Sequence, residues 1–110
     1  EGTGNGFNHD FINDIMSDSS VPIVVHGGAG SKEDILDIIN KSKCDAVCSA
    51  SLFHYEAIEN FKKNKIYNTQ NENEGNFDFI NSNKSFEKIN SINIVELKKY
   101  LIKNNISIRP

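Results

Sequence analysis

The chain has 110 residues, of which 37% are hydrophobic and 25% are charged, a balance typical of one soluble globular domain. None of its apolar stretches approaches the roughly 20 residues needed to cross a bilayer, so we expect no membrane span. Twelve basic side chains are scattered among fifteen acidic ones, which argues against a nucleic-acid-binding surface. The spacing of His, Cys, Asp and Glu does not match that of metal ligands, so we expect no metal site.

The first predicted helix covers residues 9–17 and follows a glycine-rich loop. Asn8 is a plausible N-cap for it. Apolar side chains recur at helical spacing and give the helix one apolar stripe, made of Phe7, Phe11, Ile12 and Ile15. The only histidine of this segment, His9, is expected on the surface.

A strand, a glycine turn and a helix start follow one another closely. The strand is the apolar run 22–26, and Ser31 begins a capping box for a helix that ends near Asn40. Such a junction directs backbone N–H groups and the positive end of a helix dipole at one place, which is how proteins hold phosphate. A tight connection without a ligand gives the same pattern. The turn itself consists of Gly27, Gly28, Ala29 and Gly30.

A second strand is predicted over residues 45–49 and ends in small residues, Ala50 and Ser51, before a helical run. Alternating helices and strands predict a parallel sheet. Its two strand exits would then lie side by side and could share one phosphate, which favours a phosphate site over a plain turn. Cys44 and Cys48 are expected to be buried core thiols rather than zinc or disulfide ligands.

The second half of the chain is rich in Asn and Lys. Residues 64–93 show no sustained periodicity, so an ordered excursion pinned by aromatic side chains and a disordered segment both fit them. Residues 95–102 predict a final amphipathic helix, followed by an extended tail over residues 106–110. Of the remaining histidines, His54 is expected to pack or cap. His26 could contact a substrate, but a hydrogen bond to a neighbouring loop is the favoured interpretation.

Two parallel strands with three or four helices cannot cover both faces and both edges of a sheet. An eight-stranded parallel barrel needs roughly 250 residues. We therefore expect this chain, which begins at Glu1 rather than Met, to be the last two strand–helix units of such a barrel and the helix before them.

Three motifs together resemble one enzyme family: Gly2-Thr3 after an acidic residue, the glycine turn after an apolar strand, and Ala50-Ser51-Leu52-Phe53-His54-Tyr55. In order and spacing they are similar to the cyclase subunit of imidazole glycerol phosphate synthase. The likeness runs from Glu1 to about Tyr55 and resumes from about Ile94 to Arg109. It implies an α/β fold, the C-terminal portion of a (β/α)8 TIM barrel from the loop after strand 6 through helix 8. Residues 1–110 would form one partial barrel domain with an Asn-rich insertion at about 56–93.

The resemblance also implies a function. A cytoplasmic enzyme of this family receives ammonia from a partner glutaminase, needs no cofactor, and converts a phosphorylated ribulose-type nucleotide into imidazole glycerol phosphate and AICAR during histidine biosynthesis. The loops after strands 7 and 8 hold one substrate phosphate, and Gly2 and Thr3 map onto the loop that helps hold the other. The residues that map onto the first phosphate site are Gly27, Gly28, Ala29, Gly30, Ala50 and Ser51.

The chain departs from the family in four respects. The two catalytic aspartates of the family map upstream of Glu1, so the chain alone is expected to be inactive. Glu1 replaces the usual aspartate and His26 replaces a small residue, and both are candidate substrate contacts. Glu1, His26 and the insertion also fit a paralogous branch that uses ammonia to amidate nucleotide sugars or nonulosonic acids for surface polysaccharide. A non-catalytic phosphate-binding module, a gene remnant and another phosphate-binding barrel remain further alternatives.

Overall fold

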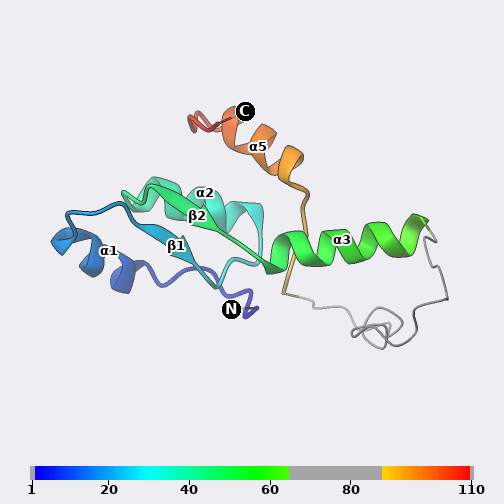
Figure 1. The fold of residues 1–110 in the computed structure, drawn as a ribbon, viewed down its shortest axis with the longest axis horizontal. Coiled ribbons are helices and arrows are strands. Elements are labelled where there is room, and N and C mark those ends of the chain that lie inside the picture. The colour runs from blue at the N-terminus through cyan, green and yellow to red at the C-terminus, as the bar shows by residue number, and fades with distance from the viewer. Residues whose placement is uncertain (1, 65–87, 110) are drawn as a thin grey trace.

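The structure is a computed structural model that describes residues 2–64 and 88–109. The order of helices and strands along the described chain is the predicted one (Figure 1). The predicted excursion at 64–93 falls mostly on residues outside this description. The elements are α1 (His9–Asp18), β1 (Val24–His26), α2 (Lys32–Lys41), β2 (Ala46–Cys48), α3 (Ser51–Asn64) and α5 (Ile94–Lys103).

Side-chain caps fix where the helices begin. The Asn8 side chain accepts a hydrogen bond from the Phe11 N–H at 3.2 Å, which confirms the predicted start of α1. The capping box of α2 is also confirmed, because Ser31 Oγ accepts from the Asp34 N–H while the Asp34 carboxylate accepts from the Ser31 N–H. The side chain of Asn93 caps α5 in the same way, accepting from the Glu96 N–H at 2.9 Å.

The two strands pair in parallel, as predicted, with His26 opposite Cys48 at their carboxyl ends. Both strands are shorter than the predicted runs. Just before β1, a side chain takes the place of a backbone acceptor on the neighbouring strand. The Ile23 N–H donates to the Asp45 carboxylate at 2.8 Å. The Ile23 carbonyl in turn accepts from the Asp45 N–H at 3.0 Å.

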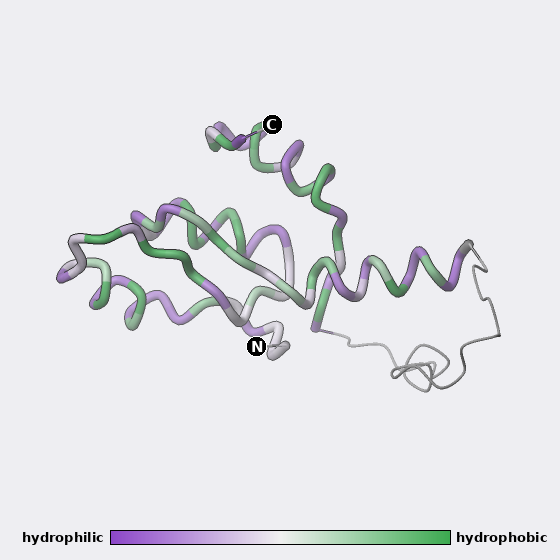
Figure 2. The backbone as a smooth tube through the Cα atoms, in the orientation of Figure 1, coloured by the Kyte–Doolittle hydropathy of each residue, from purple (hydrophilic) through white to green (hydrophobic). Residues whose placement is uncertain are grey.

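One face of this sheet lies toward the hydrophobic core. Along β1 only Val25 is buried, while its neighbours Val24 and His26 are exposed, so the strand alternates between the core and the opposite face. Ile38 of α2 and Leu52 of α3 are fully buried. Figure 2 shows the apolar stretches along both strands and along the helices around them. The same buried cluster also contains Phe7, Ala29, Ile35, Leu97 and Leu101.

The apolar stripe of α1 is less buried than its pattern suggests. Phe11 is 62% exposed and Ile15 46% exposed, and the helix has no buried residue. Phe7, just before the helix, does join the core. The remaining stripe residues line one wall of a shallow groove whose other wall is β1, so the stripe faces the strand without being covered.

The prediction that both cysteines are buried core thiols is wrong. Cys44 is partly buried and Cys48 is exposed, and both are free thiols. Cys44 precedes β2, so the alternation of strand side chains does not apply to it. Cys48 lies on the face of the sheet that is turned away from the core, because in β2 it is the intervening Val47 that is partly buried.

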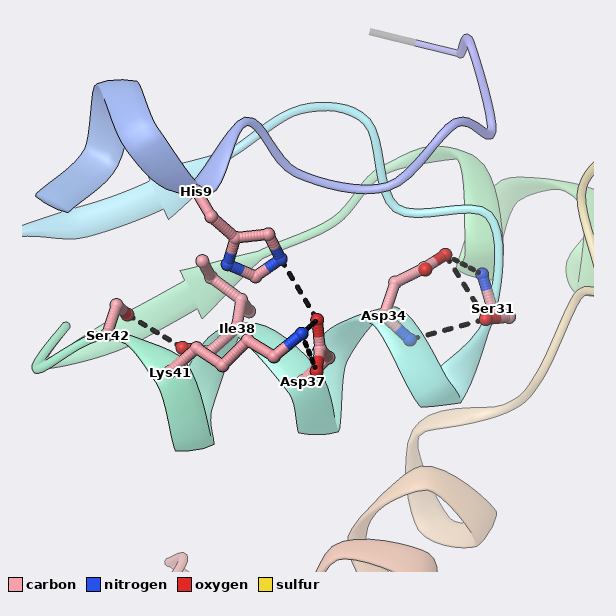
Figure 3. A network of polar contacts seen from close by, with 7 residues as sticks. All are labelled: His9, Ser31, Asp34, Asp37, Ile38, Lys41 and Ser42. Atoms are coloured by element: carbon pink, nitrogen blue, oxygen red, sulfur yellow. Dashed lines mark hydrogen bonds and ion pairs between the residues drawn. The ribbon is translucent and has the colours of Figure 1, made fainter.

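An ion-pair network joins α1 to α2 (Figure 3). His9, expected simply on the surface, is partly buried, and its Nε2 lies 3.0 Å from Asp37 Oδ2. Lys41 Nζ lies 2.8 Å from the other oxygen of the same carboxylate. The hydrogen bond from Lys41, followed by smaller charge effects of Lys41 and His9, holds the pKa of Asp37 below its usual value despite some desolvation.

This network predicts a pH dependence of stability. Because the pKa of Asp37 is lower in the folded chain than in the unfolded chain, its contribution is complete above the unfolded value, about 3.9, and is lost as the pH falls through the folded value. We expect Asp37→Asn to lose less stability on acidification than the unsubstituted protein, as measured by urea unfolding at neutral and acidic pH. Asp14→Asn on α1 is the control and should keep the original acid dependence. An unchanged acid dependence in Asp37→Asn would contradict the prediction.

Across the described residues, the helices are too short or too polar to cross a membrane.

Candidate anion site at the strand ends

The parallel pairing brings the carboxyl ends of β1 and β2 to one edge of the sheet. The glycine turn leaves β1 at this edge, and Ser49 leads from β2 into α3 beside it. The N-terminal loop also reaches this place, since a Cβ built on Gly2 would lie 3.8 Å from Ser51 Oγ. The small pocket enclosed by these loops is lined by Gly2, His26, Gly27, Gly28, Ala29, Ser49, Ala50 and Ser51.

Two glycines of the turn have different structural roles. Gly27 and Gly28 both have a φ of 97°, a left-handed conformation that side chains rarely adopt. A Cβ on Gly28 would overlap the carbonyl oxygen of Gly6, whose N–H donates to the Gly28 carbonyl at 2.9 Å. A Cβ on Gly27 would meet no atom within 4 Å. Gly28 therefore holds the N-terminal loop against the turn, and Gly27 borders open space.

The beginning of α3 supplies a helix N-terminus to the pocket. The first hydrogen bond of this helix runs from the His54 N–H to the Ala50 carbonyl at 2.9 Å. The N–H groups of the three preceding residues, from Ser51 on, are therefore not used within the helix and point out of its N-terminus. Together with the helix dipole and the Ser51 hydroxyl, they form a positive wall for an anion.

The N-terminus of α2, which the sequence pattern favoured as a phosphate site, binds a side chain of the chain itself. The N–H groups of Gly30 and Ser31 both donate to Asp34 Oδ2, at 2.8 and 2.9 Å. A carboxylate of the chain itself thus occupies the place where a phosphate would bind. The signal for this was in the sequence, because the acidic third residue of the capping box is what reaches back to these donors.

Several of the predicted site residues lie outside the pocket. Gly30 is buried beside Gly4 and Lys88, and its carbonyl accepts from the Asn90 N–H at 2.7 Å. Thr3 is exposed and does not line the pocket. Glu1 lies outside the described residues. Ser49, which was not predicted, does line the pocket, as does His26.

The lining of the pocket suits an anion. It combines backbone donors, two hydroxyl groups and an imidazole, and none of its lining residues is acidic. Hydrogen bonds from such donors to a charged oxygen are each worth about 1.5–3 kcal/mol. A search of the part of the chain that the structure describes finds no group of three or more His, Cys, Asp or Glu side chains arranged to hold a metal ion.

Comparison with known proteins places the chain in a family. The family model described as "Histidine biosynthesis protein" matches residues 1–59. The imidazole glycerol phosphate synthase subunit HisF of Lachnoclostridium phytofermentans is 41% identical over 59 residues, which cover 54% of this chain and 23% of that protein. The protein of the same name from Lactococcus lactis subsp. cremoris is 40% identical over 72 residues, which cover 60% of this chain and 28% of the relative.

The chain thus spans about a quarter of the length of the curated relatives it matches. The matched residues include β1, β2, the glycine turn and the beginning of α3, so the likeness covers every residue that lines the pocket. The resemblance inferred from the three motifs is confirmed, and the α/β fold with its parallel strands agrees with the TIM-barrel fold of this family. The chain belongs to the histidine biosynthesis protein family.

Proposed function

We propose that this chain provides a phosphate-binding end of an imidazole glycerol phosphate synthase cyclase subunit, with β1 and β2 as strands 7 and 8 of its TIM barrel. The observation that carries the proposal is the convergence of the glycine turn, the start of α3 and Gly2 on one pocket at the carboxyl ends of two parallel strands. Enzymes with this barrel commonly bind phosphate at the loops after their last two strands.

In the proposed complex, the phosphate receives backbone N–H groups from the turn around Gly27 and from the first turn of α3, and a hydrogen bond from the Ser51 hydroxyl. Ala29 and Ala50 each carry only a methyl group beside the site. Gly2 approaches from the N-terminal loop, and Thr3 beside it would help to hold the second phosphate of the substrate. Gly30 contributes by shaping the turn, since its N–H donates to Asp34.

The reaction we propose is that of the complete enzyme. Ammonia from a glutaminase partner is used to close the imidazole ring of imidazole glycerol phosphate with release of AICAR, and residues upstream of the chain supply the catalytic aspartates. The chain described here would bind substrate without catalysing the reaction. Its residues from about 56 to 93 would be an insertion in the barrel, which fits the end of the family match at residue 59.

Phosphate binding can be tested directly by titrating inorganic phosphate into the ¹⁵N-labelled protein. We expect the amide signals of Gly27 and Ser51 to shift with one common dissociation constant, because both residues line the same pocket. The amide of Ser31 is the internal control and should shift little, since it already donates to Asp34. Saturating shifts at Ser31 and none at Ser51 would move the anion site to α2 and contradict the proposed pocket.

The acceptor substrate calls for a genetic test. We expect a full-length gene that contains this sequence, co-expressed with its glutaminase, to restore growth without histidine to a bacterium that lacks the cyclase subunit. A second candidate is the amidation of nucleotide sugars or nonulosonic acids, which is favoured by His26 lining the pocket where histidine-pathway enzymes carry a small residue. Failure to restore growth by a protein that does bind phosphate would favour this second function.

A further inference from the structure

His26 and Cys48 form a cross-strand pair on the open face of the sheet. They are register partners at the carboxyl ends of β1 and β2, so their side chains leave the sheet on the same side. Neighbouring strands lie about 4.8 Å apart, which makes the imidazole and the thiol neighbours. Both residues are exposed, whereas Val25, one position earlier on β1, points into the core.

This pair adjoins the anion pocket. His26 lines the pocket and directly precedes Gly27, while Cys48 directly precedes Ser49, another residue of the lining. On the side of the turn, Gly28 is closed off by its contact with Gly6. An anion in the pocket can therefore extend a substituent over the sheet face, where it would meet this pair.

The sheet face beyond the pair is apolar. The next residues on the same face are Val24 and Ala46, a register pair of which both members are exposed. A group that leaves the pocket would thus pass one polar ring and one small thiol before it reaches apolar side chains. This order suits a phosphate ester that carries a hydrogen-bonding group close to the ester oxygen, because the imidazole can donate to or accept from such a group.

We propose that His26 and Cys48 form the wall that holds the organic part of a phosphate monoester, with the imidazole hydrogen-bonded to a hydroxyl near the ester and the thiol in van der Waals contact with it. This inference rests on the proposed phosphate site and adds to it a specificity-determining pair. It distinguishes a phosphate ester from free phosphate, which has no organic part for the pair to hold.

Binding measurements on the purified protein test the role of His26, with ribose 5-phosphate and inorganic phosphate as probes. We expect His26→Ala to weaken the binding of ribose 5-phosphate about tenfold more than it weakens the binding of inorganic phosphate, because one additional hydrogen bond is lost. His54→Ala is the matched control, because His54 is an exposed histidine on α3 that does not line the pocket. It should bind both probes as the unsubstituted protein does.

Alkylation by iodoacetamide tests the contact at Cys48, and Cys44 serves as an internal control. We expect ribose 5-phosphate at about ten times its dissociation constant to slow the labelling of Cys48 about tenfold, in proportion to the free fraction of the site. Inorganic phosphate should leave this rate unchanged. Cys44 lies outside the pocket lining and should react at the same rate throughout. Tandem mass spectrometry separates the two thiols.

The outcomes separate this inference from the function on which it rests. If both probes bind, His26→Ala weakens them equally or not at all, and the labelling of Cys48 is unaffected, the inference is overturned while the phosphate site stands. If neither probe binds the unsubstituted protein, the phosphate site itself is wrong and the inference falls with it.

Discussion

Replacing Gly28 by alanine is expected to abolish phosphate binding and to lower the free energy of unfolding by about 3 kcal/mol or more. Two costs combine in this variant. A left-handed conformation costs a residue with a side chain about 1–2 kcal/mol. The added Cβ also overlaps the backbone carbonyl of Gly6, which cannot move aside as a flexible side chain could, so the N-terminal loop must leave the turn. The loop carries Gly2 away from the pocket with it.

Gly27→Ala is the matched control for this prediction. Gly27 has the same φ of 97°, but a Cβ there would meet no atom within 4 Å, so only the conformational cost applies. We expect it to destabilise the protein by about 1–2 kcal/mol and to keep the hydrogen bond between Gly6 and Gly28. Urea unfolding measures the free energy of unfolding of both variants, and the ¹⁵N titration measures their phosphate binding. Equal losses in the two variants would show that the contact between the loop and the turn contributes nothing.

Short-range features of this fold could be predicted from the sequence because their causes lie within a few residues. Asn8 and Ser31 bond to N–H groups three positions ahead, so the helix starts follow from local chemistry. The parallel pairing of β1 and β2 follows from the helix between them, which is the usual connection of parallel strands. From that pairing, the meeting of the glycine turn with Ser51 could be predicted as well.

The rest depends on contacts between distant residues. The ion pair between His9 and Asp37 joins helices that are separated by a strand, and nothing in the sequence near either residue indicates it. The exposure of Cys48 depends on which face of the sheet the helices cover, whereas its apolar surroundings in the sequence suggested burial. The choice of α3 over α2 as the helix that faces the pocket was decided by one side chain, Asp34, which turns back onto its own helix.

The second large effect is expected at Ile38, the fully buried residue in the middle of α2. Ile38→Ala should lower the free energy of unfolding by about 3–4 kcal/mol, because the removed carbon atoms leave a cavity that the surrounding structure fills only partly. The backbone of this residue is also fixed, since its carbonyl accepts from both the N–H and the hydroxyl of Ser42, at 2.9 and 2.7 Å. The chain at this position therefore has little freedom to close the cavity.

Ile102→Ala on α5 makes the same chemical change at a residue that is 56% exposed, and it should alter stability by no more than about 0.5 kcal/mol. The comparison, made by urea unfolding, tests whether the covered face of the two-stranded sheet is a cooperative core. Val25 of β1 belongs to the same buried cluster as Ile38, so loosening this core also loosens the strand that leads into the glycine turn. Phosphate affinity should then fall in Ile38→Ala and stay unchanged in Ile102→Ala. Equal and small effects in both variants would contradict the prediction that Ile38 anchors a cooperative core.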